Sequence, residues 1–291
     1  MKKVTKAVIA AAGLGTRMLP ISHAVPKEML PIVDLPAIYY LVREAVDSGI
    51  TDILIVTHRD KESIEDFFDI SHEYREALLA KGKENELKKL VEISEMANIS
   101  YIRQLTPNGL ANAVLKAEAF AGEDPFIVLY GDDIIFSDIP VSRQLIDVYN
   151  KHGMAVVGVK SVDKSALSKY CSLKVEREFC NGEYFITDMI EKPKPGEEFS
   201  NLAILGRVLL TKDIFKEIKN LKVGYGGEYQ LTDAMANLAR SCGVVACEFS
   251  GERFDLGSKI GFLTANVREG LRHKETAEEF KKFLKDIIGE L

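Results

Sequence analysis

The sequence lacks the excess of positive charge that proteins binding nucleic acid or anionic membranes carry. It has 38 lysines and arginines against 44 aspartates and glutamates, so the formal net charge is −6 and the pI is about 5.6. A polyanionic partner requires a basic face. The composition therefore argues against nucleic-acid and membrane partners, and any phosphate-rich ligand must be held by a local cluster of cations.

Cysteine is also scarce, and its spacing excludes the usual zinc sites. The four cysteines include no C-x-x-C pair, and Cys242 and Cys247 have no neighbouring histidine that would complete a ligand set. The five histidines form no H-x-x-x-H motif. These spacings favour reduced thiols in a cytoplasmic protein over disulfides or a metal cluster.

Long apolar runs are missing as well. No segment approaches the roughly 18 consecutive apolar residues of a membrane span. The run Lys6 to Ala12 follows basic residues as a secretory signal does, but it is short and has no leucine core. We therefore predict that it is a first buried strand. With 291 residues, 46% of them hydrophobic, the chain can bury the large core of a soluble globular protein.

Strand and helix patterns alternate along the first half of the chain. This order predicts an α/β fold, a Rossmann-like, mostly parallel mixed sheet flanked by helices. We predict strands at 6–11, 52–57, 100–103, 126–130 and 155–160, with helices at 37–48, 61–69, 84–97, 110–120 and 141–151. The charged segment 71–98 has a helical period, and we interpret it as a solvated helical hairpin that covers one face.

The pattern changes after about residue 160. Two alternating segments, 172–178 and 184–190, are separated by Cys180-Asn181-Gly182 and predict a β-hairpin. We expect this region to be an insertion that packs over the open end of the sheet. Further elements are predicted towards the C-terminus: strands at 203–210 and 244–249, and helices at 211–220, 230–242, 259–273 and 276–288.

A glycine turn with nearby cations follows the first predicted strand. Gly13 and Gly15 can adopt positive φ angles at no steric cost, which lets backbone N–H groups point at an anion. Arg17 adds a planar guanidinium and Lys27 adds a compact positive charge. Both groups bind phosphates, as a polyphosphate ligand requires. An ordinary strand-to-helix turn would explain the glycines alone, but the added cations favour a phosphate-binding loop.

Two familiar glycine loops are excluded. The Walker loop needs a Lys-Ser or Lys-Thr after its glycines, and none is present. The dinucleotide fingerprint needs a small residue where Met18 stands, and an acidic residue after the second strand, where Thr57 and His58 stand. A dinucleotide-binding oxidoreductase is therefore disfavoured.

Two adjacent carboxylates follow the predicted strand 126–130. Ligands of open α/β sheets lie beyond the carboxyl ends of the strands. Asp132 and Asp133 occupy that place and suit a hard divalent cation such as Mg²⁺. A polar turn with a helix cap is the alternative, and it suits Asp133 well. Asp255 precedes a predicted helix, but spacing alone cannot bring it beside Asp132.

Several motifs together resemble a known family. The segments AAGLGTRMLP and VPKEMLPIVDLP resemble the opening signature of the bacterial sugar-1-phosphate nucleotidyltransferases, most closely their UTP–glucose-1-phosphate uridylyltransferase branch. The likeness runs from Lys6 to about His273. Its further blocks are Gly131-Asp132-Asp133, Glu191-Lys192-Pro193, Ser200 to Arg207, Gly226 to Asp233 and Phe254 to Gly257.

The resemblance implies Mg²⁺-dependent transfer of a uridylyl group from UTP to glucose 1-phosphate, giving UDP-glucose and pyrophosphate. It implies one nucleotidyltransferase domain over residues 1–291, with a nucleotide-binding part at about 1–160, a sugar-phosphate-binding part at about 161–258 and C-terminal helices at about 259–291. A cytoplasmic homodimer or homotetramer is the expected assembly.

The resemblance also assigns residues to roles. It implies that Asp132 and Asp255 bind the metal, and that catalysis depends on Arg17, Lys27, Lys192 and Asp132. The implied nucleotide-binding residues are Ala12, Gly13, Leu14, Gly15, Thr16, Arg17, Lys27, Glu28, Gln104 and Gly109, with Gln104 and Gly109 reading the base. The implied sugar-phosphate-binding residues are Asp133, Cys171, Glu191, Lys192 and Ala203.

Simpler interpretations exist for two of these blocks. Glu191 and Lys192 could be an exposed pair of neighbouring charges at a strand end. The segment Gln230-Leu231-Thr232-Asp233 could be a helix start, with Thr232 or Asp233 as the N-cap.

The chain departs from the branch pattern at four positions. His23 stands in place of a usual Lys, Asn112 in place of a His, Cys171 in place of a Gly beside the sugar, and Ala10 in place of a Pro. These changes bear on sugar identity. They also leave open a non-catalytic nucleotide-sugar-binding regulatory paralogue. A thymidylyltransferase is the closest alternative enzyme, because uracil and thymine differ by one methyl worth about 1–3 kcal/mol.

Overall fold

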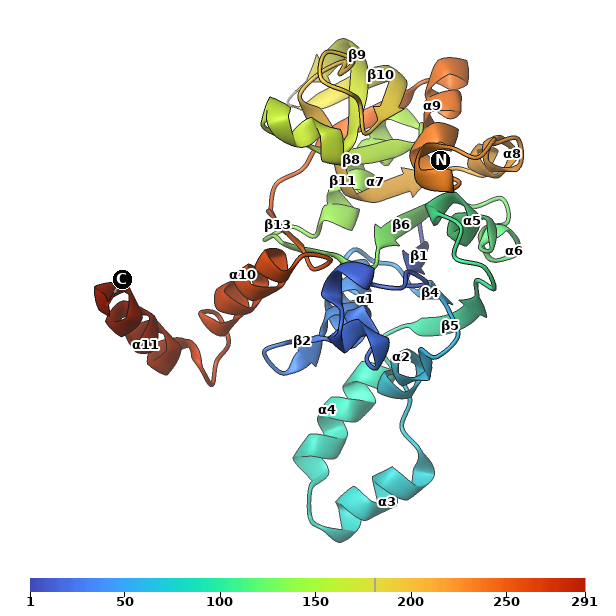
Figure 1. Cartoon of the computed structure of the whole chain (residues 1–291). Coiled ribbons are helices and arrows are strands. Elements are labelled where there is room, and N and C mark those ends of the chain that lie inside the picture. The colour runs from blue at the N-terminus through green and yellow to red at the C-terminus, as the bar shows by residue number, and fades with distance from the viewer. Residues whose placement is uncertain (181, 291) are drawn as a thin grey trace.

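A nine-stranded mixed sheet forms the centre of the molecule. The structure, a computed structural model, describes residues 1–180 and 182–290. The sheet order is β5-β4-β1-β6-β11-β8-β12-β10-β9 (Figure 1). Four strands of the first half are parallel: β1 (Lys6–Ala10), β4 (Asp52–Thr57), β5 (Asn98–Arg103) and β6 (Phe126–Tyr130). The expected α/β fold with a mixed sheet is confirmed.

Strand β11 (Leu202–Leu210) joins the two halves of the sheet. It pairs antiparallel with β6 on one side and with β8 (Val156–Ser161) on the other. Strand β12 (Val244–Glu248) is parallel to β8. The hairpin of β9 (Cys171–Cys180) and β10 (Glu183–Glu191) forms the far edge, where β10 pairs with β12.

The prediction that the region after residue 160 packs over the open end of the sheet is wrong. Its strands continue the sheet, and β11, which is buried at every position, has a neighbouring strand on both edges and cover on both faces. The expected hairpin is present. Asn181, in its predicted turn, lies outside the described residues.

Helices cover both faces of the sheet because side chains alternate along each strand. Val8 of β1 packs in a core with α5 (Leu110–Leu115), α8 (Asp213–Lys219) and α9 (Leu231–Cys242). Its neighbours Ala7 and Ile9 face the opposite core, formed with α1 (Ala37–Asp47) and α7 (Val141–His152). Shorter helices are α2 (Glu62–Phe67) and α6 (Glu118–Ala121), and 3-10 turns occur at Thr16–Met18, Ile21–His23, Lys27–Met29, Lys164–Lys169 and Tyr225–Gly227.

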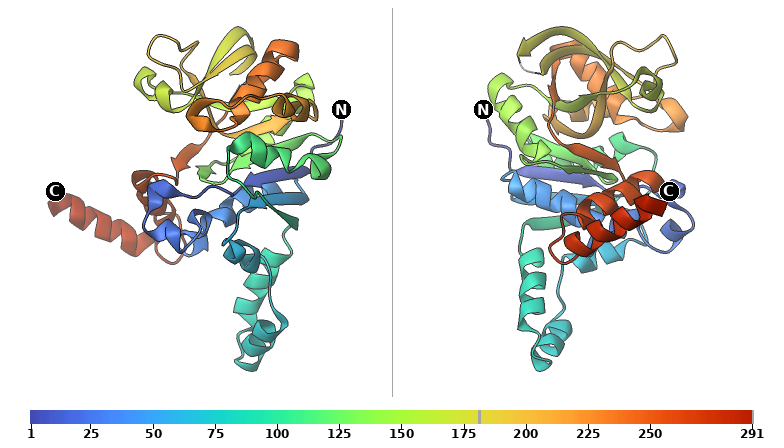
Figure 2. Two further views of the ribbon diagram at one scale, coloured as in Figure 1. Left: turned by 45° about the vertical axis from the view of Figure 1, so that its right-hand side comes forward. Right: turned by 90° about the vertical axis from the view of Figure 1, so that its left-hand side faces the viewer.

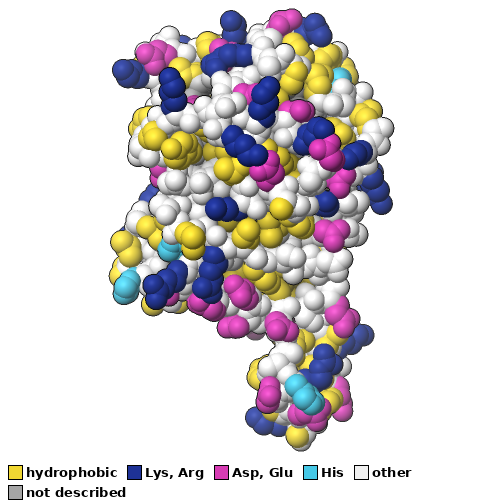
Figure 3. Space-filling view, turned by 90° about the vertical axis from the view of Figure 1, so that its right-hand side faces the viewer, with side chains coloured by type: hydrophobic (Ala, Val, Ile, Leu, Met, Phe, Trp, Pro, Cys, Tyr) yellow, Lys and Arg dark blue, Asp and Glu magenta, His cyan; other side chains and the backbone are white. Residues whose placement is uncertain are grey.

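The helical hairpin of α3 (His72–Ala80) and α4 (Glu84–Ser94) projects away from the sheet (Figures 1 and 2). The helices were expected, but the prediction that they cover one face is wrong. Only Leu78 in α3 and Leu87 in α4 are buried. Figure 3 shows charges of both signs over this lobe. Their apolar seam is narrow, so the two helices pack mainly on each other, and only the end of α4, at Ile93, contacts the core beside the sheet.

Two small ribbons were missed by the sequence patterns. Strand β7 (Asp133–Phe136) pairs antiparallel with β13 (Glu252–Asp255), and this register sets Asp133 opposite Asp255. A second ribbon joins β2 (Pro31–Ile32) to β3 (Leu35–Pro36).

The C-terminal helices extend away from the sheet (Figure 2). They are α10 (Lys259–Gly270) and α11 (Ala277–Glu290). Among residues 1–180 and 182–290, no helix combines the length and the apolar character needed to cross a membrane.

Candidate active site

The glycine turn leaves β1 at the carboxyl edge of the sheet. Gly15 has a φ of +67°, a left-handed conformation that favours glycine. Within the described part of the chain, the N–H groups of Ala12, Gly13 and Leu14 donate to no backbone carbonyl. Successive free N–H groups form a concave anion site. The turn therefore has the geometry of a phosphate-binding loop.

Arg17 and Lys27 meet the two predicted metal carboxylates in one cleft. Arg17 Nη2 lies 3.4 Å from Asp132 Oδ2, and its Nη1 lies 3.3 Å from Asp255 Oδ2. Lys27 Nζ lies 2.7 Å from the same Asp132 oxygen. The ribbon of β7 and β13 supplies what spacing along the chain could not, because it carries Asp255 to the side of the cleft where Asp132 lies.

Gly257 makes room for this contact. A Cβ atom on Gly257 would lie 2.2 Å from Arg17 Nη2 and 2.9 Å from Asp132 Oδ2. Any side chain there would displace the guanidinium from between the carboxylates. Gly257 therefore decides whether Arg17 can reach both acids.

The charge state of Asp132 is suited to binding a cation. Burial alone would raise its pKa, but Lys27 and Arg17 outweigh burial and hold the pKa below its ordinary value. No group of three or more His, Cys, Asp or Glu residues that could hold a metal occurs in the described ranges. A pair of carboxylates fits Mg²⁺, which keeps waters and substrate phosphates in its shell and uses only one or two protein carboxylates.

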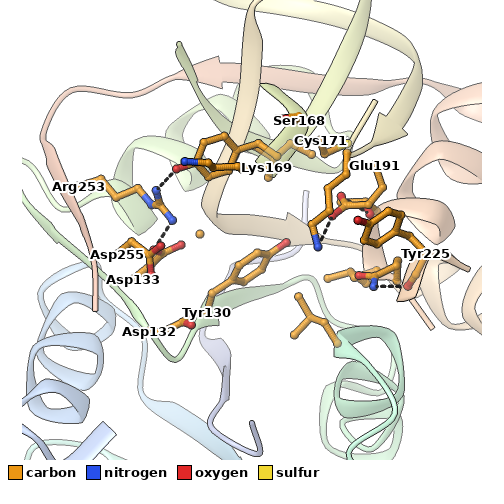
Figure 4. Close-up of a pocket in the computed structure, with 18 of the residues that line it drawn as sticks. Tyr130, Asp132, Asp133, Ser168, Lys169, Cys171, Glu191, Tyr225, Arg253 and Asp255 are labelled. Carbon is orange, nitrogen blue, oxygen red and sulfur yellow. Dashed lines mark hydrogen bonds and ion pairs between the residues drawn. The ribbon is translucent and has the colours of Figure 1, made fainter. Parts of the chain in front are cut away.

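Asp133 lies in a different environment from its neighbour. It is the first residue of β7, not a helix cap, which corrects the alternative raised by the sequence. Arg253 Nη2 lies 2.6 Å from its Oδ1, and Tyr170 OH accepts a hydrogen bond from Arg253 Nη1 at 3.3 Å. Burial raises the pKa of Asp133 to about 6 in spite of Arg253. Figure 4 shows Arg253 reaching from β13 towards this carboxyl.

A cavity of about 620 Å³ opens beside these acids (Figure 4). Four predicted sugar-phosphate residues line it, Asp133, Cys171, Glu191 and Lys192. Ala203, the fifth, does not reach it. Its side chain is fully buried in the core on the other face of β11, whereas the next residue, Ile204, lines the cavity.

Glu191 and Lys192 are part of this cavity wall and not an exposed charge pair. Glu191 is 13% exposed and its Oε2 accepts a hydrogen bond from Thr232 Oγ1 at 2.9 Å. Lys192 has a φ of +46°, and its Nζ lies 3.7 Å from Glu191 Oε1 and 4.8 Å above the Tyr225 ring.

The N-cap of α9 is Gln230, without a side-chain hydrogen bond, so neither Thr232 nor Asp233 caps this helix.

A second cavity of about 440 Å³ lies over the glycine turn. It shares Leu110, Tyr130 and Asp132 with the first cavity, so the two meet at Asp132. The predicted nucleotide-binding residues in its wall are Ala12, Gly13, Leu14, Gly15, Thr16, Lys27, Gln104 and Gly109. Two others lie elsewhere. Arg17 lines the first cavity, and Glu28 lines neither because it is buried behind the turn.

The orientation of the Gln104 amide is fixed by its neighbours. Gln104 is 3% exposed, and its Nε2 donates to Gly109 O at 3.2 Å and to Asn112 Oδ1 at 3.1 Å. A backbone carbonyl can only accept, so the nitrogen must face it. Oε1 is therefore the group with which Gln104 can accept a hydrogen bond from a base.

Three residues of the site were not singled out from the sequence. Arg253 could have been found, because it lies two residues before Asp255 and alternate residues of a strand share a face. Tyr225 and Lys61 carried no such signal. Lys61 follows β4 as an isolated lysine, and only the fold shows that it reaches the glycine turn.

Comparisons with known proteins agree with this geometry. A family model described as nucleotidyl transferase matches residues 6–270. The chain is 49% identical over 288 residues to the UTP–glucose-1-phosphate uridylyltransferase YngB of Bacillus subtilis (strain 168), with 99% of this chain and 96% of that protein covered.

Solved structures give the same result. A UTP-bound UGPase from Acinetobacter baumannii has a TM-score of 0.88 at 38% identity, covering 97% of this chain and 98% of that one. A UDP-glucose pyrophosphorylase complexed with UDP-glucose has a TM-score of 0.84 at 39% identity, covering 93% of this chain and 100% of that one. Since both the family model and these relatives span nearly the whole sequence, the chain belongs to the nucleotidyl transferase family.

Proposed function

We propose that this protein transfers a uridylyl group from UTP to glucose 1-phosphate, giving UDP-glucose and pyrophosphate. The observation that carries the proposal is the meeting of two polar cavities at Asp132, one over a loop of free N–H groups and one lined by Glu191 and Lys192. A nucleoside triphosphate fits the cavity over the glycine turn, and a sugar phosphate fits the cavity lined by Glu191 and Lys192. The names of the relatives support UTP and glucose 1-phosphate as the two substrates.

The reaction joins two anions, so its barrier is mainly one of charge and placement. An oxygen of the sugar phosphate attacks the α-phosphorus of UTP in line, and pyrophosphate leaves. That oxygen is already ionised, so no side chain has to remove a proton. Positioning supplies several kcal/mol of the acceleration, and preorganised cations supply a few kcal/mol more.

The side chains divide this work by location. Lys27 and the free N–H groups of the glycine turn hold the triphosphate, and Arg17 neutralises charge at the point where the cavities meet. Lys192 holds the phosphate of the sugar. Glu191, fixed by Thr232, accepts hydrogen bonds from sugar hydroxyls.

Asp132 and Asp255 would hold Mg²⁺, which would supply positive charge to offset the negative charge of the substrate phosphates. Arg17 contacts both carboxylates in this structure. For the ion to bind, Arg17 would have to release at least one of them, and its guanidinium would then contact phosphate.

The base is selected through Gln104. Its Oε1 accepts the N3–H of uracil, and the same contact repels cytosine, whose N3 is an acceptor. Thymine presents the same N3–H, so discrimination against dTTP depends on space for its methyl group.

Three further expectations belong to the same proposal. The nucleotide-binding part covers about residues 1–160 and the sugar-phosphate-binding part about 161–258. The protein works in the cytoplasm. It assembles as a homodimer or homotetramer.

The test is pyrophosphate release from purified protein given Mg²⁺, glucose 1-phosphate and each nucleoside triphosphate in turn. We expect release with UTP. Faster release with dTTP would indicate a thymidylyltransferase, and UTP binding without release would indicate a regulatory paralogue. Asp132→Asn should lower kcat by about 10²–10³-fold, whereas the exposed Asp138→Asn control should retain it. Near-normal turnover in Asp132→Asn would contradict the role of this carboxylate.

A further inference from the structure

Lys61 lies behind the glycine turn with all its hydrogen-bonding capacity used. Its ammonium group is 2.5 Å from Ala11 O, 2.8 Å from Gly13 O and 2.8 Å from Glu28 Oε2. An ammonium has three N–H donors, and each of them has one of these acceptors. Lys61 is 7% exposed and Glu28 is fully buried. The contact therefore joins α2, the glycine turn and the 3-10 turn at Lys27–Met29.

This contact determines which way the backbone of the turn faces. In a planar trans peptide, the C=O of one residue and the N–H of the next point in opposite directions. With the carbonyls of Ala11 and Gly13 directed at Lys61, the N–H groups of Ala12 and Leu14 are directed away from it. Ala12 and Leu14 line the nucleotide cavity, and Lys61 and Glu28 do not.

Glu28 completes the arrangement from the same buried side. Lys27 extends over the turn to Asp132, while the next residue, Glu28, binds Lys61 beneath it. Two consecutive residues thus hold the turn from opposite sides. The buried carboxylate also supplies the counter-charge without which the Lys61 ammonium would lie unpaired in a dry site.

We propose that Lys61, with Glu28 as its counter-ion, is a positioning residue that holds the glycine turn in the shape that binds the triphosphate. The inference rests on the proposed function. Glu28 then contributes to nucleotide binding through Lys61 and not by touching the nucleotide.

The experiment separates positioning from stability by using two variants. Lys61→Met leaves the Glu28 carboxylate buried and unpaired, and we expect it to unfold at a lower temperature. The double variant Lys61→Met with Glu28→Gln removes both charges, and we expect it to regain most of that stability. Neither variant restores a donor to the carbonyls of Ala11 and Gly13, so both should bind UTP weakly.

The measurements are UTP dissociation constants by calorimetry, thermal unfolding, and KM for each substrate. We expect the double variant to raise the UTP Kd at least tenfold and to change the KM for glucose 1-phosphate less than twofold. Lys151→Met is the matched control, because it removes a lysine paired with the buried Glu183 on a different part of the sheet, and its UTP Kd should not change.

Two results would overturn the proposal: a UTP Kd like that of the wild type in the double variant, or equal losses for both substrates. If that variant does not fold, Lys61→Arg keeps the charge pair but cannot place one planar group on all three acceptors, and a wild-type Kd there would also overturn it. A wild type that binds no UTP would instead contradict the proposed function.

Discussion

Arg17 contacts both Asp132 and Asp255 in the cleft, and its side chain is 61% exposed. An exposed guanidinium can change partners at little cost, whereas Lys27, which is mostly buried, cannot. Arg17 therefore suits a step in which charge moves, and Lys27 suits permanent binding. The difference follows from burial, since both residues contact the same Asp132 oxygen.

Gly257→Ala tests the position of Arg17. The added methyl group would overlap Arg17 Nη2, so the guanidinium must leave the gap between Asp132 and Asp255. We expect kcat to fall about tenfold or more, with little change in thermal stability because Arg17 is exposed. Gly289→Ala is the control, since an added Cβ there meets no atom of the described residues within 4 Å. Full activity of Gly257→Ala would contradict the role of Arg17.

Asn112→Ala tests the orientation of the Gln104 amide. Removal of Asn112 Oδ1 takes away one of the two acceptors that fix Gln104 Nε2. We expect KM for UTP to rise about fivefold, as for the loss of one neutral hydrogen bond, and the preference for UTP over CTP to fall. Steady-state kinetics with both nucleotides measures this. Asn150→Ala, exposed on α7, serves as the control, and an unchanged preference in Asn112→Ala would count against the assignment.

At the scale of elements, the ribbon of β7 and β13 matters most for the site. It is short, and neither strand has a strong pattern of its own. The ribbon nevertheless places Asp255, Arg253 and Gly257 beside the residues that follow β6. Side-chain contacts hold the far edge of the sheet, where Glu183 of β10 binds Lys151 and His152 of α7.

Glu183→Gln tests the contact between α7 and β10. Burial alone would raise the pKa of Glu183, but Lys151 and His152 outweigh it and hold the pKa below its ordinary value. A lowered folded-state pKa gives stability that is present above the unfolded pKa and is lost as pH falls through the folded pKa. At pH 7 we expect the unfolding free energy to fall by about 1–2 kcal/mol, a value reduced because Lys151 is more than half exposed.

Urea denaturation at pH 7 and below pH 4 measures this dependence. The difference between Glu183→Gln and the wild type should shrink at the lower pH, because the wild-type carboxylate is then being protonated. Exposed Glu176→Gln is the control and should match the wild type at both. A constant difference at all pH values would show that Glu183 acts through packing and not through charge.

At the scale of the whole molecule, the sequence predicted elements better than it predicted their neighbours. The strands of the parallel half and the glycine turn were found because each carries a local pattern, an apolar run or a pair of glycines. The position of β11 was not found, because pairing between distant strands leaves no local trace. For the same reason, only the family resemblance predicted that Asp255 lies beside Asp132, and no sequence pattern predicted that Lys61 contacts the glycine turn.

Removal of divalent cations tests the metal site on the intact protein. No group of three or more His, Cys, Asp or Glu residues that could hold a metal occurs in the described part of the chain, and two carboxylates, Asp132 and Asp255, are too few for a structural metal. We therefore expect EDTA to abolish pyrophosphate release and leave the unfolding temperature nearly unchanged. Added Mg²⁺ should restore turnover. A large drop in unfolding temperature with EDTA would indicate a structural ion elsewhere.

The fully buried strand β11 also limits how the molecule can move. It runs between β6, which leads to Asp132, and β8, on the side of the sugar cavity, with hydrogen bonds to both. One continuous sheet thus lies under both cavities, so a hinge between them would have to break that hydrogen bonding. We therefore expect any closure around the substrates to occur in the surface segments that rim the cavities, such as the turn at Tyr225–Gly227.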